Sequence, residues 1–451
     1  MYRHNARKSH TYRLKTHTYN PRKPRTRKNK KHGGKAIDAG TYGCVFSPSL
    51  KCINNNNSNN KSSKSNNSDF VSKLMMNKYA NVEMNEIENV KKIISQISNN
   101  DKYFLISNTQ LCKPDKLTNE DLIEFDTKCS NIVENNITSN NINNKLDELS
   151  IISMPNGGVT MEIYWKNVLS NKDKYGFFMK TNTKLISLLK NAIVPLNKLG
   201  MNHFDIKDGN VLFSTDGFPR LIDWGLSSKN DGKTIPETLL NRSVAFNMPF
   251  SNLFFNDFIK ELLLNELKHI KNSNDSLNKS SGQKELLKIV AINIINKLFE
   301  ELGDGHFELI TSIFLHTIYK IYANDRGYSM VDYNSLTTNV IVEYIQTVLI
   351  YYVDENGNFD DKKYYYDIFV KNADIWGFIM VYIPIIEHGI EVFNKELING
   401  LCRIFLKYCF SSEYAVKVID INELEKDLLS LNNIASLNSI APNSNIKKNI
   451  S

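Results

Sequence analysis

HFDIKDGN, at residues 203–210, and DWG, which begins thirteen residues after Asn210, decide how this chain of 451 residues folds. Asp205, Lys207, Asn210 and Asp223 fall at fixed offsets in these two stretches. A carboxylate can accept the proton of an attacking hydroxyl, and a lysine two residues later can neutralise a migrating phosphoryl group. Amide and carboxylate oxygens are ligands that Mg²⁺ prefers. The spacing therefore predicts a phosphotransfer site, with Asp205 as catalytic base, Lys207 beside it, and Asn210 and Asp223 as metal ligands.

The residues between the two stretches predict how the metal ligands meet. Val211–Phe213 and Arg220–Ile222 have the composition of short strands, and Ser214–Gly217 has that of a turn. A hairpin of this kind would bring Asn210 close to Asp223.

With these motifs the chain resembles the eukaryotic-type protein kinase superfamily, whose catalytic loop follows H-R-D-x-K-x-x-N and whose metal motif is D-F-G. Phe204 stands in place of the arginine, and Trp224 in place of the phenylalanine. The resemblance implies ATP and Mg²⁺ as cofactors and an α+β, bilobal protein-kinase-like fold. A small β-rich N-lobe would span 33–158, and a larger helical C-lobe 159–430.

The phosphate-covering loop of such a fold is expected near the start of the N-lobe. Ile37–Phe46 reads IDAGTYGCVF and matches the second and third glycines of G-x-G-x-x-G-x-V, while Asp38 stands at the first. Glycine lets a backbone approach phosphates closely and present its N–H groups. The predicted nucleotide-binding residues here are Ile37, Gly40, Thr41, Tyr42, Gly43 and Val45.

A lysine and a glutamate should complete the nucleotide site. Phe70–Met75 alternates like a half-buried strand, and its Lys73 resembles the kinase lysine that binds the α and β phosphates. Val82–Ile97 has the apolar spacing of a helix, which should carry the glutamate that pairs with Lys73. Glu86 is the first choice for that partner, and Glu83, one turn earlier on the same face, is the alternative.

The segment between the lobes and the C-lobe motifs match the family pattern less closely. Residues 151–158, IISMPNGG, are expected to link the lobes and to present backbone groups to adenine. The resemblance implies that Asp374 begins a central helix and ties down the catalytic loop; a simple helix cap is the alternative. No A-P-E motif follows Gly225, so the peptide-docking segment is open. Apolar residues at helical spacing predict a helical insertion at about 250–370.

Charge and low complexity mark three further segments. Residues 1–32 hold twelve Lys and Arg and no acidic residue, so they account for the formal net charge of +8. This disordered basic tail could attach to nucleic acid or an anionic surface, act as a nuclear address, or simply aid solubility. An Asn/Ser-rich insertion is predicted at 53–69, and a second disordered tail at 431–451.

The cysteines and apolar runs bear on the compartment. Six cysteines form no C-x-x-C pair, so we expect neither zinc nor a disulfide framework, and we infer a reducing, intracellular location. The most apolar stretch, Trp376–Ile386, is too short to span a bilayer, so no transmembrane segment is predicted. The abundance of Asn and the amino-lobe motif resemble kinases of large DNA viruses, which implies the host cytoplasm or the virion; a nuclear location stays open.

Three functions remain in competition. Lys207 favours a serine/threonine protein kinase acting on a protein substrate. The missing A-P-E motif leaves a small-molecule kinase of the same fold open. Asp38 and the basic tail suggest a non-catalytic pseudokinase scaffold that binds a polyanion. Because Phe204 has neither charge nor donor for a phosphorylated residue, we expect activity without phosphorylation between Gly225 and Pro249.

Overall fold

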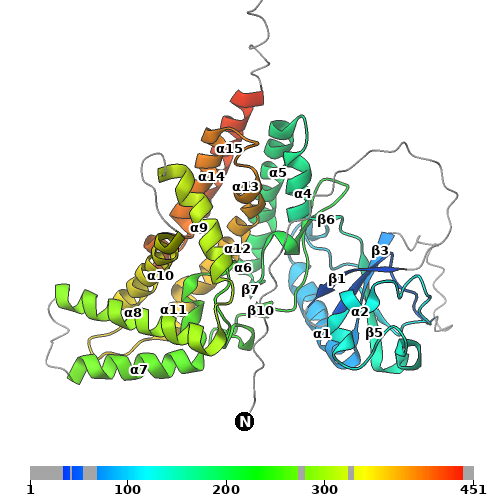
Figure 1. Ribbon diagram of the computed structural model, residues 1–451, viewed down its shortest axis with the longest axis horizontal. Helices are drawn as coiled ribbons and strands as arrows, with labels where there is room; N and C mark the ends of the chain where they lie inside the picture. The colour runs from blue at the N-terminus through cyan, green and yellow to red at the C-terminus, as the bar shows by residue number, and fades with distance from the viewer. Residues whose placement is uncertain (1–33, 41–42, 54–68, 273–279, 323–329, 440–451) are drawn as a thin grey trace, which may run out of the picture.

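The computed structural model describes residues 34–40, 43–53, 69–272, 280–322 and 330–439. It is a mixed α+β structure, as predicted. A small antiparallel sheet with one long helix occupies the N-terminal part, and helices dominate the rest of the chain (Figure 1). The predicted basic tail at 1–32 and nearly all of the predicted insertion at 53–69 lie outside the described residues.

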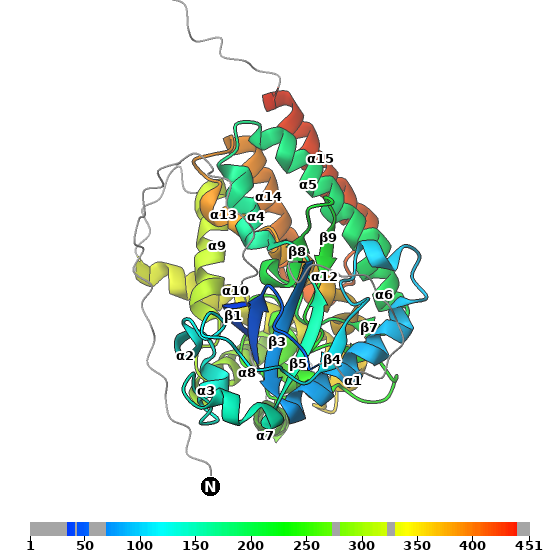
Figure 2. The ribbon, with the colours of Figure 1, turned by 90° about the vertical axis from the view of Figure 1, so that its right-hand side faces the viewer.

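The N-terminal sheet has the strand order β1-β2-β3-β5-β4, and every neighbouring pair is antiparallel. Its strands are β1 (Lys35–Gly40), β2 (Gly43–Ser47), β3 (Phe70–Met76), β4 (Gln110–Cys112) and β5 (Leu149–Pro155). Helix α1 (Asn77–Ile94) follows β3 directly and buries Ile87, Val90 and Ile94. Figure 2 shows the sheet facing the viewer, with α1 along its lower edge. The predicted strand at 70–75 is confirmed, and the predicted helix begins five residues earlier than expected.

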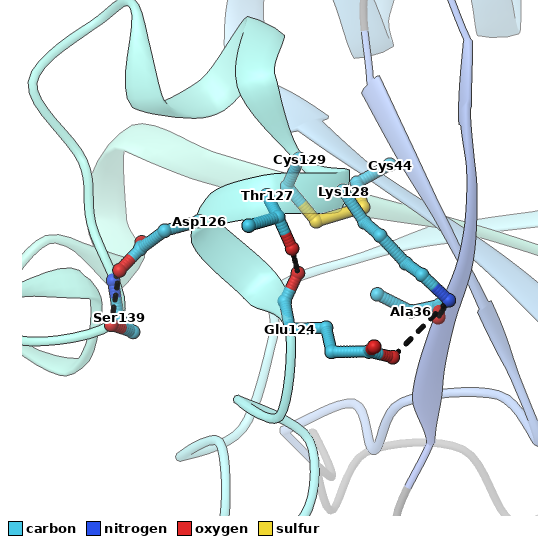
Figure 3. Close-up of a disulfide and its surroundings, with 8 residues drawn as sticks. All are labelled: Ala36, Cys44, Glu124, Asp126, Thr127, Lys128, Cys129 and Ser139. Atoms are coloured by element: carbon cyan, nitrogen blue, oxygen red, sulfur yellow. Dashed lines mark hydrogen bonds and ion pairs between the residues drawn. A yellow bond between two sulfur atoms is a disulfide. The ribbon is translucent and has the colours of Figure 1, made fainter. Parts of the chain in front are cut away.

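Two disulfides crosslink the N-terminal part: one joins β2 to the segment between β4 and β5, and the other joins β4 to the segment after β2. Cys44 of β2 is bonded to Cys129, which lies between the short helices α2 (Phe125–Lys128) and α3 (Ser130–Val133) (Figure 3). Cys52 is bonded to Cys112 of β4. The prediction that no disulfides form is therefore wrong. The sequence separations of 85 and 60 residues hid these pairs, because only the folded sheet brings the cysteines together.

Two small sheets carry the central loops of the chain. One has the order β6-β8-β9, and β7 pairs with β10 in the other. These strands are β6 (Val159–Thr160), β7 (Met201–Asn202), β8 (Val211–Phe213), β9 (Pro219–Leu221) and β10 (Ser228–Lys229). The predicted hairpin is confirmed, since β8 and β9 pair in register from Val211 opposite Leu221 to Phe213 opposite Pro219.

Helices build the C-terminal part around a buried centre. A helical run over residues 174–198 leads toward the HFD loop and passes through a π-helical stretch at Leu189–Ile193. The first helices are α4 (Met161–Leu169), α5 (Lys174–Leu188) and α6 (Val194–Lys198). The last are α11 (Asp361–Tyr364), α12 (Val370–Met380), α13 (Ile383–His388), α14 (Lys395–Tyr408) and α15 (Ile421–Ser439).

The predicted helical insertion is confirmed as helical structure. It contains α7 (Asp257–Asn272), α8 (Ser280–Leu302), α9 (Phe307–Tyr322) and α10 (Met330–Tyr352). Their apolar faces are buried, including Leu263 and Leu267 of α7 and Leu287 and Leu298 of α8. In Figure 1 the end of α8 and the start of α9 lie toward the middle of the molecule, near β7 and β10.

Helix α12 is the centre of the helical part, because ten of its residues are buried. One helical run, Asp361–His388, has the length and apolar composition to cross a membrane, and 94% of its most apolar window is buried inside the protein. This run is longer than the stretch 376–386 singled out in the sequence. Burial of that kind is typical of the core helix of a folded domain.

The disordered C-terminal tail is predicted to begin at residue 431, which is too early. α15 continues to Ser439, and Leu431 and Ala435 are buried. Asn182 of α5 donates to the Leu428 carbonyl and to the Asn432 side chain, at 2.8 and 2.9 Å. The asparagines that suggested low complexity therefore lie on a packed helix, and residues 440–451 are outside the described part of the chain.

The Cys44–Cys129 disulfide should stabilise the N-terminal sheet. Replacing both cysteines by alanine should lower the free energy of unfolding by about 3–5 kcal/mol, because a crosslink over this separation restricts the unfolded chain. Urea unfolding without reductant measures the loss. Reductant should destabilise the unmodified protein more than the double variant; an equal response of both would contradict a stabilising role for this crosslink.

Candidate active site

The loop that carries HFD is held by a single buried carboxylate. Asp374 of α12 accepts hydrogen bonds from the backbone N–H groups of His203 and Phe204, at 2.9 and 2.8 Å. The side chains of Asn197 and Asn202 also donate to it, at 2.7 and 3.2 Å. Asp374 is 1% exposed. The predicted contact of Asp374 with the loop backbone is observed, but Asp374 does not begin the helix: it lies inside α12, which starts at Val370, and this position excludes a simple helix cap.

Phe204 adopts a left-handed backbone conformation, with φ of 57°. A bulky residue rarely takes this conformation unless its surroundings hold it there. Two neighbours do so: Asp374 accepts from the Phe204 N–H, and Gly377 lets α12 close on the loop. A Cβ atom at Gly377 would lie 2.5 Å from the Ile206 carbonyl oxygen. The tight turn therefore depends on α12 as much as on its own sequence.

Three side chains form hydrogen bonds with Asp205 and together fix both of its carboxylate oxygens. Lys207 Nζ lies 3.1 Å from Oδ1 and 2.9 Å from Oδ2. Asn210 Nδ2 donates to Oδ2 at 2.8 Å, and Asn247 Nδ2 donates to Oδ1 at 2.8 Å. The Asp205 side chain is 12% exposed. The predicted Asp205, Lys207 and Asn210 thus form one group of interacting side chains.

The hairpin places Asn210 beside the second motif. The Ile222 N–H donates to the Asn210 carbonyl oxygen at 3.1 Å. The Asn210 side-chain amide donates to the Asp205 carbonyl and carboxylate, and no described donor occupies Asn210 Oδ1. Asp223 follows at once, exposed and with a φ of 62°. The geometry leaves an amide oxygen and a carboxylate available as neighbouring oxygen ligands.

Aromatic packing fixes the DWG motif against the loop that carries HFD. The Trp224 ring packs against His203, with centroids 4.7 Å apart, and against Phe104, 5.7 Å away. His203 Nδ1 accepts from the Asp205 N–H at 3.3 Å, so Nε2 carries the proton that it donates to the Ile222 carbonyl at 3.0 Å. The substitution of Trp for Phe in the motif is therefore accommodated in a buried aromatic stack.

Lys73 pairs with Glu83, and the prediction of Glu86 is wrong. Lys73 Nζ lies 2.8 and 2.9 Å from the two carboxylate oxygens of Glu83, and both side chains are largely buried. The helical pattern could not separate the two glutamates, because residues three apart share one helix face. The choice depends on the start of α1 immediately after β3, which turns Glu83 toward the sheet.

Carboxylates accumulate where a cation would bind. Burial raises the pKa of Glu83, and so does the negative charge of Asp223, although Lys73 opposes the shift. Burial also raises the pKa of Glu86, with Glu83 and Asp223 acting in the same direction. Lys73 forms an ion pair with Glu83, and the charges of two further carboxylates, Glu86 and Asp223, act on the same region. This excess of negative charge and the hard oxygen donors of Asn210 and Asp223 fit a magnesium ion.

The predicted glycine-rich loop is described only in part. β1 and β2 form the expected hairpin, with Gly40 opposite Gly43, and Val45 lies opposite Lys73 on β3. Ile37 is exposed and Gly43 is buried. Thr41 and Tyr42, at the tip, lie outside the described residues. The hairpin therefore lies next to β3, the strand that carries Lys73.

Three residues near Asp205 had no distinct signal in the sequence. Asn247 comes from the segment that replaces A-P-E, and its role is visible only through its bond to Asp205. Arg242 Nη1 reaches the Phe204 carbonyl at 3.5 Å. His306, in the α8–α9 turn, donates its backbone N–H to the Val244 carbonyl at 2.9 Å. The helical insertion thus contributes directly to the surroundings of the site.

No protein-family model matches the chain, and a search of curated proteins finds no significant match.

Removing the Asp374 carboxylate should destabilise the whole protein. Asp374→Ala leaves two buried backbone N–H groups and two asparagine amides without their acceptor, so we expect a loss of about 3 kcal/mol or more in the free energy of unfolding. Urea unfolding provides the measurement. Asp115→Ala, at an exposed position, should change it by no more than about 0.5 kcal/mol. Similar losses in both variants would exclude a special role for Asp374.

Asp208 should make stability fall as pH rises. Burial, and then the charge of Glu162, raise its pKa to about 6 from an ordinary value of 3.8. Between these values the native state holds the proton more tightly than the unfolded state, so the free energy of unfolding decreases with rising pH. Asp208→Asn should therefore gain stability relative to the unmodified protein between pH 4 and pH 7, by about 1 kcal/mol or more.

Asp216 provides a control, because its effect on stability should change with pH in the opposite direction. Hydrogen bonding to Arg220 lowers its pKa to about 2. Asp216→Asn should therefore lose stability relative to the unmodified protein as pH rises from 2 to 4, and show no further change above that range. Unfolding curves from pH 2 to 8 for both variants test this, and identical pH dependence in the two would contradict both assignments.

Proposed function

We propose that this protein is an ATP-dependent serine/threonine protein kinase with a bilobal protein-kinase-like arrangement. The observation that carries the proposal is the network around Asp205. One carboxylate is oriented by Lys207, Asn210 and Asn247, and the Asn210 backbone is hydrogen-bonded to Ile222, the residue before Asp223. A base, a charge-neutralising lysine and two oxygen ligands are thus gathered in one place.

The nucleotide would lie between the N-terminal sheet and the catalytic loop. Lys73, held by Glu83, would bind the α and β phosphates, and the β1–β2 hairpin would cover them. Residues 151–158, in β5 and just after it, would present backbone groups to adenine. Asn210 and Asp223 would hold Mg²⁺, which neutralises charge on the transferred phosphoryl group.

Asp205 would receive the proton of the acceptor hydroxyl as the new bond to phosphorus forms. Its two oxygens are already fixed by hydrogen bonds, so little reorganisation is needed when the hydroxyl arrives. Lys207 lies against the same carboxylate and would stabilise charge on the equatorial oxygens of the migrating group. ADP would leave as the γ-phosphoryl group is transferred to the hydroxyl.

The alternatives differ in what they require of this site. A pseudokinase scaffold needs none of these contacts, yet the Lys73–Glu83 pair and the Asp205 network are both assembled. A small-molecule kinase would use the same groups on a different acceptor. Attachment of residues 1–32 to a polyanion, and a viral, intracellular location, remain hypotheses that rest on the sequence alone.

Phosphotransfer should depend on Asp223 and on Glu83 rather than Glu86. Asp223→Ala removes a metal-ligand carboxylate and should lower the rate of Mg²⁺-dependent phosphotransfer by about 10²-fold or more. Glu83→Gln breaks the ion pair that positions Lys73 and should lower it by about tenfold. Glu86→Gln is the matched variant, and its loss should be several times smaller.

Transfer of labelled phosphate from ATP to mixed protein substrates measures all three variants. Circular dichroism and unfolding curves control for folding. Undiminished activity in Asp223→Ala would refute the proposed function. A larger loss in Glu86→Gln than in Glu83→Gln would refute the assignment of the ion pair but leave the function standing.

A further inference from the structure

Arg242 is a cation beside the catalytic loop with no acidic partner. Its guanidinium is partly buried, and its one hydrogen bond among the described residues goes to the Phe204 carbonyl at 3.5 Å. No carboxylate of the described part of the chain forms an ion pair with it. Burial lowers the pKa of Arg242, and Asp205 is the carboxylate whose charge opposes that shift.

Asp205 cannot serve as that partner. Lys207, Asn210 and Asn247 already occupy both of its oxygens. A partly buried guanidinium without an anion is unfavourable, and arginine is the side chain best suited to bind phosphate or carboxylate through two parallel hydrogen bonds. The position of Arg242 therefore indicates an anion supplied from outside the folded chain.

A second possible hydrogen-bond donor for an anion comes from the helical insertion. The α8–α9 turn packs tightly on the segment that contains Arg242: Gly305 has a φ of 53°, and a Cβ atom there would lie 2.5 Å from the Val244 carbonyl oxygen. The next residue, His306, is exposed, and its ring packs on Phe246 with centroids 5.3 Å apart. Burial lowers the pKa of His306, and the charges of Lys207 and Arg242 lower it further, whereas Asp205 raises it.

The hydrogen bonds of Asp205 indicate on which side of its carboxylate Arg242 and His306 lie. Oδ2 accepts from Asn210, whose strand leads to Asp223 and the proposed nucleotide. Oδ1 accepts from Asn247, on the segment that carries Arg242. Arg242 and His306 therefore border the side of Asp205 that faces away from the metal ligands. In the proposed reaction this is the side of the acceptor.

We propose that the acceptor is an acidic peptide, in which Arg242 and His306 bind a phosphate or carboxylate close to the hydroxyl that is phosphorylated. This inference rests on the proposed kinase function and specifies its substrate class. Arg242 supplies the fixed charge, and His306 adds a donor that takes up a proton when a dianion binds. Lys207 remains with Asp205 and the transferred phosphoryl group.

Matched serine peptides test the proposal on the full chain. Three peptides of equal length carry phosphoserine and glutamate, alanine, or lysine beside the same acceptor serine. The unmodified protein should show a kcat/KM about tenfold or more higher for the acidic peptide than for the neutral one, as expected for charge-assisted hydrogen bonds. A preference for the neutral or basic peptide would overturn the proposal.

Variants assign the preference to its residues. Arg242→Gln should bring the acidic-to-neutral ratio close to one, mainly by raising KM for the acidic peptide, and Arg242→Lys should retain part of the preference because it keeps the charge. His306→Gln should lower the ratio about two- to fivefold. His269→Gln removes an exposed histidine of α7 and should keep the full ratio. An unchanged ratio in Arg242→Gln would exclude Arg242 as the anion site.

A binding measurement separates this inference from the proposed function. The same peptides with alanine at the acceptor position cannot react, and fluorescence anisotropy reports their affinity. Tighter binding of the acidic peptide that is lost in Arg242→Gln would support the anion site even if no phosphotransfer occurred. Equal binding of all three peptides, or phosphate found on Ser243 of the purified protein in contact with Arg242, would show that Arg242 does not bind the acceptor.

Discussion

The buried carboxylate of Asp374 is the interaction on which the site depends. It accepts hydrogen bonds from two successive backbone N–H groups of the catalytic loop and from two asparagine side chains. The loop can therefore hold Phe204 in a left-handed conformation and direct Asp205 away from the core. Because Asp374 belongs to α12, the most deeply buried helix, the position of the proposed base is set by the centre of the helical part. A surface loop alone could not impose this geometry.

Asp205 also connects two sides of the proposed reaction. Its Oδ2 is bonded to Asn210 and so to the β8–β9 hairpin that ends at Asp223, and its Oδ1 is bonded to Asn247 of the segment that leads to Arg242. The same segment is fixed from several directions by hydrogen bonds that involve no phosphorylated residue. Trp376 Nε1 donates to the Phe246 carbonyl at 2.9 Å, and the Asn241 side chain and Asp257 exchange hydrogen bonds at 2.9 and 3.0 Å. Phe204 has no charge with which to pair a phosphorylated residue of this segment. The hydrogen bonds given above hold the segment in place without such a pair.

The two parts of the molecule are stabilised by different means. The large continuous core is built mainly by the helical part, to which α7–α10 contribute buried faces, and it extends to α1 of the N-terminal part. The N-terminal sheet has a second, smaller core, and two disulfides hold its strands β2 and β4 to distant segments. A small core buries less apolar surface per residue, so crosslinks have a larger effect there. The disulfides also remove the reason for inferring a reducing compartment from the cysteine spacing.

The sequence by itself determined the elements whose signals are local. The HFDIKDGN and DWG stretches, the strand with Lys73, the hairpin between Asn210 and Asp223 and the helical insertion all depend on residues close together in the chain. Tertiary structure alone decided the partners that are far apart. Glu83 and Glu86 share a helix face, so only the start of α1 against β3 selects Glu83. The cysteine pairs, the packing of α15 beyond residue 431, and the approach of Arg242, Asn247 and His306 to Asp205 arise when separate elements meet. Periodicity describes which face of an element is buried, but it contains no information on which distant residue that face will contact.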